Sequence, residues 1–554
     1  MLFKSIHPDI EVPQDVTLWS WLFDNPKLTN SATKGLTDAL TEQHCSYQDV
    51  SLRAKYLSTA LQRVLTLREG DVALVYSRNA IQYPVAMLAA LRLGVVACGV
   101  SPDYSSEELS HCLELSQAKC IFTTQDKLEA AQIAAKNCGM EASHVVLFDA
   151  DVVGTHGFDN LISAGKAAGE KSEAQTFRIT PGRSNTRLCA FLCFSSGTTG
   201  LPKAVQISHA NVIAQCLQVQ QITPSDHDKV MGGLPYYHVT GLIHQFALPI
   251  ALNANVYVLS KYTLDTFLET ASKYRVRELL VVPPILLRMV REREVLSRYD
   301  LSHIKRFSSG AAPLPKAILE ELESHFPGSG FKQGYGLSES CSAITSHPPS
   351  KYAYRNADKV GMLVASTELK IVNMESCKEM GVGEEGEIWA RGPQIAMGYL
   401  NNATATAEAF DADGFLHTGD IGMMDSEGML HITDRAKEMI KVKGIGVAPA
   451  EIEQLLLSHP AVSDIAVCGI SDERSGERPK AFVVLQVGTS NSQQTAQSIM
   501  QYVSERKARA KWLAEVEVVD TIPKSAAGKI LRRQLRARKP QSGRVWRMAP
   551  SSKL

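Results

Sequence analysis

The sequence of 554 residues has no net charge, because 58 lysines and arginines balance 58 aspartates and glutamates. A chain without a basic excess has no electrostatic footprint for nucleic acid or an anionic membrane. Regular cysteine spacing is also missing, since the 11 cysteines are scattered and odd in number. The pattern excludes a disulfide scaffold and a zinc site with closely spaced ligands, and it predicts reduced thiols in an intracellular compartment.

Long apolar runs are absent as well. The most apolar stretch, residues 85–100, contains Arg92 and Gly94, so it falls short of the roughly 20 uninterrupted apolar residues of a membrane helix. Lys4 and Asp9 lie where a signal peptide would have its hydrophobic region. We therefore expect no membrane span and no secretion signal.

Signatures of other protein classes are missing too. The sequence contains no internal repeats of the solenoid type, no H-E-x-x-H zinc motif and no G-x-S-x-G nucleophile elbow. No motif in the sequence therefore supports a hydrolase.

The C-terminal residues carry a targeting signal. The last three residues, Ser552, Lys553 and Leu554, match the C-terminal SKL tripeptide that a peroxisomal import receptor recognises. The signal predicts a peroxisomal import receptor as a partner and the peroxisomal matrix as the location.

The length exceeds one ordinary core, since domains average roughly 150 residues. Strand-like and helix-like runs alternate from residue 71 onward, which predicts βα units with covered sheets. The composition changes near Asp434, and the rest resembles a smaller α+β unit with a basic, solvated tail after Arg532. We therefore expect an α/β fold with a large N-terminal domain, residues 1–434, and a small C-terminal domain, residues 435–554.

One loop combines the features that phosphate binding uses. Residues 195–203 read SSGTTGLPK, with glycines, a row of hydroxyl donors and one lysine. A loop that leaves a strand and precedes a helix can wrap N–H and O–H donors around a polyphosphate. It is not a Walker loop, because the spacing G-x-x-x-x-G-K-[ST] fails at Pro202.

Five segments in this order resemble the adenylate-forming family, which includes 4-coumarate–CoA ligases, acyl-CoA synthetases and beetle luciferases. They are FSSGTTGLPKAV at 194–205, QGYGLSE at 333–339, HTGD at 417–420, DRAKEMIKVKGIGVAPAE at 434–451 and PKSAAGKILRR at 523–533. The resemblance is collinear over almost the whole chain. It implies an acyl-CoA ligase that forms an acyl-adenylate from ATP and a small-molecule carboxylic acid, and then an acyl-CoA.

The resemblance also assigns roles to residues. Lys529 would stabilise the adenylation transition state from a mobile small domain, and His238 would gate the acyl site near the carboxylate. Glu339 would bind Mg²⁺, a metal that prefers hard carboxylate oxygens. The residues assigned to ATP or AMP are Ser195, Ser196, Gly197, Thr198, Thr199, Gly200, Lys203, Ala311, Gln333, Gly334, Tyr335, Ser338, Asp420 and Arg435.

Two further sets complete the implied site. The pocket for the acyl group would be lined by Tyr237, Thr240, Gly310 and Gly336, a mixture that suits an aromatic or medium-chain acid. Coenzyme A would be used after rotation of the small domain about a hinge containing Lys437, Lys441, Lys443 and Gly444. Gly446 departs from the family, which often has glutamine there, so the details of the second step stay open.

Three alternatives also stay open. The segment GYGLSESCSAI at 334–344 and the C-terminal SKL leave room for luciferase-like oxygenation after adenylation. A separate carrier protein could replace coenzyme A as the acceptor. A degenerate nucleotide-binding module would be expected to lose Lys529, Glu339 or Asp420, and all three are present.

Overall fold

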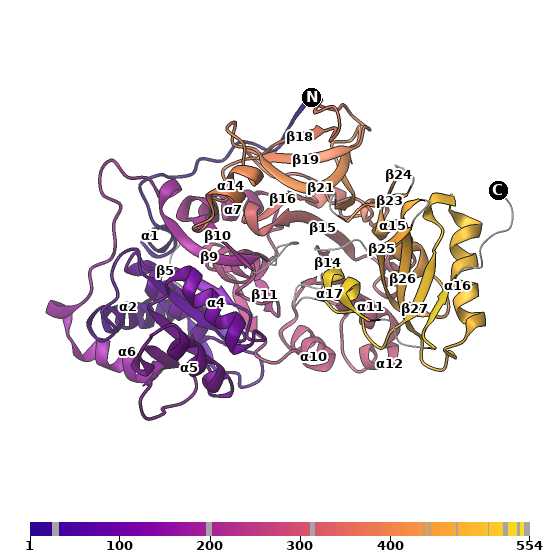
Figure 1. Cartoon of the computed structure of the whole chain (residues 1–554). Coiled ribbons are helices and arrows are strands. Elements are labelled where there is room, and N and C mark those ends of the chain that lie inside the picture. Colours follow the sequence, from indigo (N-terminus) through magenta and orange to yellow (C-terminus); the bar gives the residue numbers. More distant parts are fainter. Residues whose placement is uncertain are drawn as a thin grey trace.

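The computed structural model describes residues 1–24, 33–195, 202–310, 316–435, 438–442, 445–472, 475–507, 509–524, 530–539 and 543–547. It is an α/β fold with a large N-terminal domain and a small C-terminal domain, which is the yellow unit in Figure 1. The predicted fold class is confirmed. The predicted boundary falls at the end of β22 (Leu430–Arg435), after which β23 (Ile440–Val442) enters a different sheet.

The first sheet contains the alternating βα units. Val72–Tyr76 and Val96–Val100 are buried along their whole length, because helices cover both faces of the sheet. One face packs on α2 (Tyr47–Arg63), α3 (Gln82–Arg92) and α6 (Phe158–Ala167), and the other on α4 (Ser106–Ser116) and α5 (Leu128–Asn137). The strand order is β20 (Gly398–Tyr399), β10 (Lys203–Ser208), β9 (Cys189–Ser195), β5 (Val96–Val100), β4 (Val72–Tyr76), β6 (Cys120–Thr123), β7 (Val145–Leu147) and β8 (His156–Gly157).

Two further sheets follow in the N-terminal domain. One has the order β11 (Lys229–Gly232), β12 (Asn255–Val258), β2 (Gly35–Asp38) and β3 (His44–Ser46). The other has the order β13 (Glu278–Val281), β14 (Arg306–Ser309), β15 (Gly330–Leu337), β16 (Ser342–Ser346) and β17 (Met362–Leu363). The helices in and around these sheets are α1 (Leu18–Phe23), α7 (His209–Gln221), α8 (Val239–Gly241), the π-helix Leu242–Ala247, α9 (Leu248–Ala251), α10 (Leu264–Tyr274), α11 (Pro283–Arg291), α12 (Arg293–Leu296) and α13 (Lys316–His325).

An antiparallel sheet closes the N-terminal domain. Its order is β1 (Leu2–Lys4), β18 (Glu368–Val372), β19 (Gly386–Arg391), β21 (Leu416–Met424) and β22, with α14 (Ala403–Ala409) beside it. The register of β21 and β22 places Asp420 opposite Arg435. Two residues of the predicted nucleotide site are therefore a cross-strand pair.

The C-terminal domain has the strand order β24 (Ile445–Val447), β23, β26 (Gly476–Leu485), β27 (Glu515–Val518) and β28 (Val545–Arg547), and β25 (Val462–Asp472) also pairs with β26. Its helices are α15 (Pro449–Leu456), α16 (Gln493–Arg506) and α17 (Arg532–Ala537). The prediction of a solvated tail after Arg532 is wrong for these residues. Leu535 of α17 is buried in a hydrophobic cluster, and β28 adds a strand beside β27.

Three other observations bear on the sequence predictions. None of the 11 cysteines, all of which lie in the described ranges, forms a disulfide, as predicted. Among the described residues, no helix combines the length and hydropathy needed to cross a membrane. The polar, glycine-containing stretch 154–186 contains α6, which buries Phe158 and Leu161 against the first sheet.

Candidate active site

The predicted phosphate loop joins two antiparallel strands. Lys203 of β10 pairs with Ser195 of β9, and the residues between them, 196–201, lie outside the described ranges. The helix expected after the loop is α7, which Ser208 caps, and β10 lies between the loop and this helix. The N-terminus of α7 is therefore separated from the loop by the length of a strand.

Lys203, Tyr399 and Glu339 form a cluster beside this loop. The Lys203 ammonium lies 5.0 Å from the centre of the Tyr399 ring, and the Tyr399 hydroxyl donates to Oε1 of Glu339 at 2.8 Å. Burial, and then the Glu339 carboxylate, raise the pKa of Tyr399, so its hydroxyl stays protonated and donates. The sequence motifs did not point to Tyr399, which reaches the site because β20 pairs with β10.

The cluster fits a divalent cation bound together with phosphates. Mg²⁺ is usually held by one or two carboxylates plus substrate phosphates and water. Among the described residues, no group of three or more His, Cys, Asp or Glu side chains forms a complete metal cage. Glu339 can thus supply one carboxylate ligand while phosphate oxygens supply others.

Asp420, Tyr335 and Arg435 meet at the middle of β21, where Asp420 pairs with Arg435 at the end of β22. The Tyr335 hydroxyl donates to Oδ2 of Asp420 at 2.7 Å, and Nε of Arg435 lies 3.0 Å from Oδ1. The Asp420 side chain is 4% exposed, whereas that of Arg435 is 34% exposed. Burial, and then Asp420, raise the pKa of Tyr335 well above its ordinary value, so this hydroxyl also stays a donor. A carboxylate held in place by two donors can accept hydrogen bonds from the two hydroxyls of a ribose, and a partly exposed arginine beside it can donate to them.

The predicted residues on β15 have different surroundings. Gln333 is buried, and with its amide nitrogen facing acceptors it donates to the carbonyls of Ala357 and Lys359. Its side chain therefore connects β15 to residues 357–359. Gly334 and Gly336 lie on the opposite side of the strand and keep accessible surface. Ser338 begins the short turn that carries Glu339.

Two of the predicted acyl residues, Tyr237 and Thr240, lie with His238 at the start of α8, whereas Gly310 follows β14 and Gly336 lies in β15. Nδ1 of His238 accepts from the Thr240 N–H at 3.4 Å, so the imidazole caps the helix. Burial lowers the pKa of His238, which keeps the imidazole neutral. Tyr237 lies against Gly99, where a Cβ atom would approach the Tyr237 backbone to 2.8 Å. A neutral His238 can gate a site but brings no positive charge to a carboxylate.

The small domain contributes residues near the predicted lysine. Lys524 and Ile530 form a bridge, and the Leu531 N–H donates to the Pro523 carbonyl at 2.8 Å, so both ends of segment 525–529 are anchored. Arg532 follows, and its guanidinium binds Glu438 and Glu453. Arg291 of α11 donates to the Ser463 carbonyl at 3.0 Å, which joins the two domains.

Several predicted site residues lie outside the described ranges. Of the hinge set, Lys441 is described: its N–H donates to Glu477 at 2.8 Å and its side chain is exposed. The predicted site residues outside the described ranges are Ser196, Gly197, Thr198, Thr199, Gly200, Ala311, Lys437, Lys443, Gly444, Lys529, Ser552, Lys553 and Leu554.

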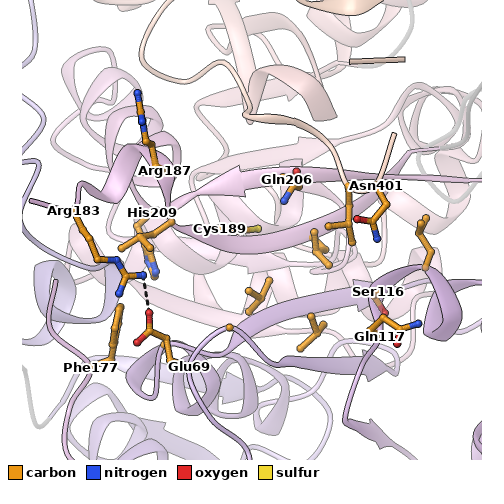
Figure 2. A pocket seen from close by; sticks show the side chains of 18 residues that line it. Glu69, Ser116, Gln117, Phe177, Arg183, Arg187, Cys189, Gln206, His209 and Asn401 are labelled. Carbon is orange, nitrogen blue, oxygen red and sulfur yellow. Dashed lines mark ion pairs between the residues drawn. The ribbon is translucent and has the colours of Figure 1, made fainter. Parts of the chain in front are cut away.

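A cavity of about 360 Å³ lies elsewhere in the N-terminal domain (Figure 2). Val72, Val96 and Cys189 line it from the amino ends of β4, β5 and β9, and an ion pair of Arg183 with Glu69, 2.6 Å apart, crosses its side. Ser195 lies at the opposite, carboxyl end of β9, where open α/β sheets bind ligands. The cavity is therefore not the predicted nucleotide site.

Comparisons with known proteins bear on this arrangement. The family model described as "AMP-binding enzyme" matches residues 29–400, and "AMP-binding enzyme C-terminal domain" matches residues 451–529. The chain is 34% identical to 4-coumarate-CoA ligase 1 of Narcissus pseudonarcissus over 97% of its length and 96% of that protein. It is also 34% identical to 4-coumarate–CoA ligase 1 of Petroselinum crispum, over 97% of both chains.

Solved structures show the same fold. The o-succinylbenzoate CoA synthetase of Bacillus subtilis, in complex with its acyl-adenylate intermediate, is 26% identical, with a TM-score of 0.78 over 96% of this chain and 100% of that one. An anthranilate CoA ligase in complex with anthranoyl-AMP is 23% identical, with a TM-score of 0.83 over 95% of this chain and 98% of that one.

Proposed function

The chain belongs to the AMP-binding enzyme family and is an AMP-forming acid–thiol ligase, and we propose that its substrate is an aromatic or medium-chain acid activated in the peroxisome. The general activity of such a ligase is ATP-dependent adenylation of a carboxylic acid, followed by transfer of the acyl group to coenzyme A. The substrate range, the use of Mg²⁺ and the compartment are the proposed parts.

The contact that carries the nucleotide assignment is that of Asp420 with Tyr335 and Arg435. These residues come from separate sequence segments, and the fold brings them together around one buried carboxylate. Bound ATP would place its ribose hydroxyls on Asp420 and Arg435. The Tyr335 ring would then lie where an adenine can stack on it.

The first half-reaction brings two anions together, the substrate carboxylate and the α-phosphate. Their repulsion has to be offset by positioned donors and cations. Lys203 and the donors of 195–200 would hold the leaving phosphates, and Lys529 would bind the reacting carboxylate and the α-phosphate. Mg²⁺, bound through Glu339, would supply further positive charge to the phosphates.

The second half-reaction needs coenzyme A to reach the acyl-adenylate. A rotation of the small domain about the segment that follows Arg435 would replace the Lys529 loop with the face of Lys441. Gly446 lies opposite Lys441 in the β23–β24 pair. Replacement of a frequent glutamine by glycine there would alter how the adenylate is held before thioester formation.

The substrate and compartment rest on other observations. The names of the plant relatives indicate an aromatic acid for those proteins, and the small and apolar residues around Gly310 and Thr240 would accommodate one here. The C-terminal Ser552, Lys553 and Leu554 support import into the peroxisomal matrix.

The test uses purified protein with Mg-ATP, coenzyme A and a panel of cinnamic, phenylacetic, medium-chain and long-chain acids. Pyrophosphate release and acyl-CoA formation are measured for the wild type, Lys529→Ala and Lys539→Ala. The last variant is the control, because it removes an exposed lysine ten residues further along the chain. We expect one acid class to give both signals, Lys529→Ala to abolish adenylation and Lys539→Ala to retain it.

Other outcomes identify the alternatives. Adenylation without acyl-CoA points to Gly446 or to a different acceptor, which a carrier protein or an assay for light would identify. Full adenylation by Lys529→Ala would remove the proposed role of this lysine. No signal with any acid would contradict the proposed substrate range. Import is tested with a fluorescent fusion, in which deletion of residues 552–554 should leave the protein in the cytosol.

A further inference from the structure

A cluster of charged side chains lies on the glycine-bearing face of the sheet formed by β13, β14 and β15. The parallel register places Glu278 beside Arg306 and Ser308 beside Lys332. Since alternate residues of a strand share a face, these side chains lie on the same side as Gly310 and Gly334. The opposite face bears Leu279, Phe307 and Phe331, which belong to a hydrophobic core.

The two carboxylates of the cluster are well bonded. Glu278, 5% exposed, accepts from Ser308 Oγ at 2.5 Å and from Arg306 Nε at 3.0 Å. Arg306 also donates to Asp226 at 2.8 Å, and Lys305 donates to the other oxygen of Asp226 at 2.9 Å. These contacts account for both anions and for two of the cations.

Lys332 is the remaining cation. Its ammonium lies 3.7 Å from Glu278, too far for a hydrogen bond, and no described residue lies within hydrogen-bonding distance of it. Its side chain is only 11% exposed. Three cations therefore face two anions, so the cluster has an excess of positive charge whatever the state of His227, which also touches Glu278.

A helix face approaches the same region from the other side. Between residues 239 and 248 the chain is buried except at Thr240 and His244, which are four residues apart and so share a face. His244 Nε2 is 3.1 Å from Ser342 Oγ. Burial, with the nearby Lys332 ammonium adding to it, lowers the pKa of His244 to about 3, so its imidazole is neutral.

Ser342 is held in a strained conformation. Its φ is 106°, in a region that side-chain-bearing residues rarely adopt. Such strain often accompanies functional sites, where surrounding structure holds a residue in place. Here it fixes the hydroxyl that meets His244.

The predicted acyl residues lie along these two faces. Thr240 lies on the helix face, and Gly310 and Gly336 lie on the sheet face, where the nearest atom to a Cβ added at Gly310 would be the Gly334 carbonyl oxygen at 3.4 Å. At Gly336 the Ser342 carbonyl oxygen already occupies this space, 1.5 Å from an added Cβ, so Gly310 is the glycine that leaves room for a ligand next to the backbone. An acyl group lying against Gly310 would have Lys332, His244 and Ser342 as polar neighbours.

We propose that the enzyme selects acids with an oxygen acceptor, a second carboxylate or a hydroxyl, at the end far from the reacting carboxylate, and that Lys332 binds this group with His244 and Ser342. The inference rests on the proposed function and names its substrate class. An enclosed ammonium without a hydrogen bond is costly even where an anion lies 3.7 Å away, as Glu278 does here. A site built to bond an oxygen also rejects the analogue without it, because its own polar groups are then left unpaired.

The experiment compares matched acids that differ only at the far end. One set is cinnamic acid with its 4-hydroxy and 4-carboxy derivatives, and the other is octanoic, 8-hydroxyoctanoic and octanedioic acid. The kcat/KM for pyrophosphate release is measured with Mg-ATP and coenzyme A. In at least one set we expect kcat/KM for an oxygen-bearing acid to exceed that for the plain acid by about 10- to 100-fold. This ratio corresponds to the free energy of one hydrogen bond to a charged group.

Variants identify the residue responsible. In Lys332→Met the ratio between the oxygen-bearing and plain acids should fall toward one, mainly through KM, and Lys332→Arg should restore part of it. Lys305→Met is the matched control, because this 57%-exposed lysine binds Asp226 in the same cluster and should leave the ratio unchanged. Thermal unfolding of each variant checks that it is folded.

The outcomes separate this inference from the proposed function. Preference of the wild type for the plain acid in both sets, or an unchanged ratio in a folded Lys332→Met, overturns the inference while the ligase activity stands. The wild-type comparison needs no variant, so poor folding of Lys332→Met does not prevent the test. If no acid of any class releases pyrophosphate, the proposed substrate range and the inference fail together.

Discussion

Two buried carboxylates of the N-terminal domain, Asp420 and Glu278, are each paired with an arginine, yet their surroundings differ. Arg435, the partner of Asp420, is 34% exposed, whereas Arg306, the partner of Glu278, is 8% exposed. A buried carboxylate with an open partner can exchange bonds with a ligand. One enclosed by cations mainly supports the fold, so the exposure of the cation separates the two roles.

The largest expected effect is on stability and comes from Glu278→Gln. The change leaves Lys332 enclosed without its anion and Arg306 with Asp226 alone, and removing one partner of a buried ion pair costs about 3–5 kcal/mol. The free energy of unfolding is measured by urea denaturation. Glu320→Gln is the control, since its pair with Lys316 is exposed on α13 and should contribute under about 1 kcal/mol. Equal effects of the two changes would remove the contrast between the carboxylates.

The next effect is on catalysis and comes from Asp420→Asn. The amide keeps the shape of the side chain but loses the charge that binds Arg435 and that we propose binds the ribose, so kcat/KM for ATP should fall about 100-fold. The variant should unfold within about 1 kcal/mol of the wild type. Pyrophosphate release at varied ATP gives the measurement, with the exposed Asp413→Asn as the control. A stability loss as large as that of Glu278→Gln, with ATP use unchanged, would reverse the two assignments.

The smallest effect concerns pH and the Glu278 side of the comparison. His244 is neutral in the folded protein, with a pKa of about 3, while the unfolded chain takes up a proton below about pH 6.5. Stability is therefore lost as pH falls from about 6.5 toward 3, by up to about 1.4 kcal/mol per pH unit for this group.

His244→Gln removes this loss, so the slope of unfolding free energy against pH should become shallower. Urea denaturation at several pH values between 7 and 5 measures the slope. His144→Gln, just before β7, is the control. Identical slopes for wild type and His244→Gln would contradict the low pKa.

Sequence patterns predicted the parts of the site that lie in continuous motifs. Asp420 and Arg435 belong to motifs that became the neighbouring strands β21 and β22, so the prediction needed only the hairpin to bring them together. The alternation of strands and helices from residue 71 onward, which includes α3 and α4, followed from local patterns in the same way.

Contacts between distant segments could not be predicted. Tyr399 reaches Glu339 through the pairing of β20 with β10, and Lys332 meets Glu278 across three strands. No local signal specifies such registers. The tail after Arg532 was mistaken for solvent-exposed chain because its many arginines concealed Leu535 and the strand β28.

The connection between the domains has one further consequence. Arg435 binds Asp420 at the proposed nucleotide site, and Glu438 binds Arg532, which follows the bridge between Lys524 and Ile530. Only residues 436 and 437 lie between Arg435 and Glu438 in the sequence. If Arg435 shifts when ribose binds at the proposed site, the shift would act through two residues on Glu438 and so on Arg532 of the small domain. Filling of that site and orientation of the small domain would then be mechanically linked.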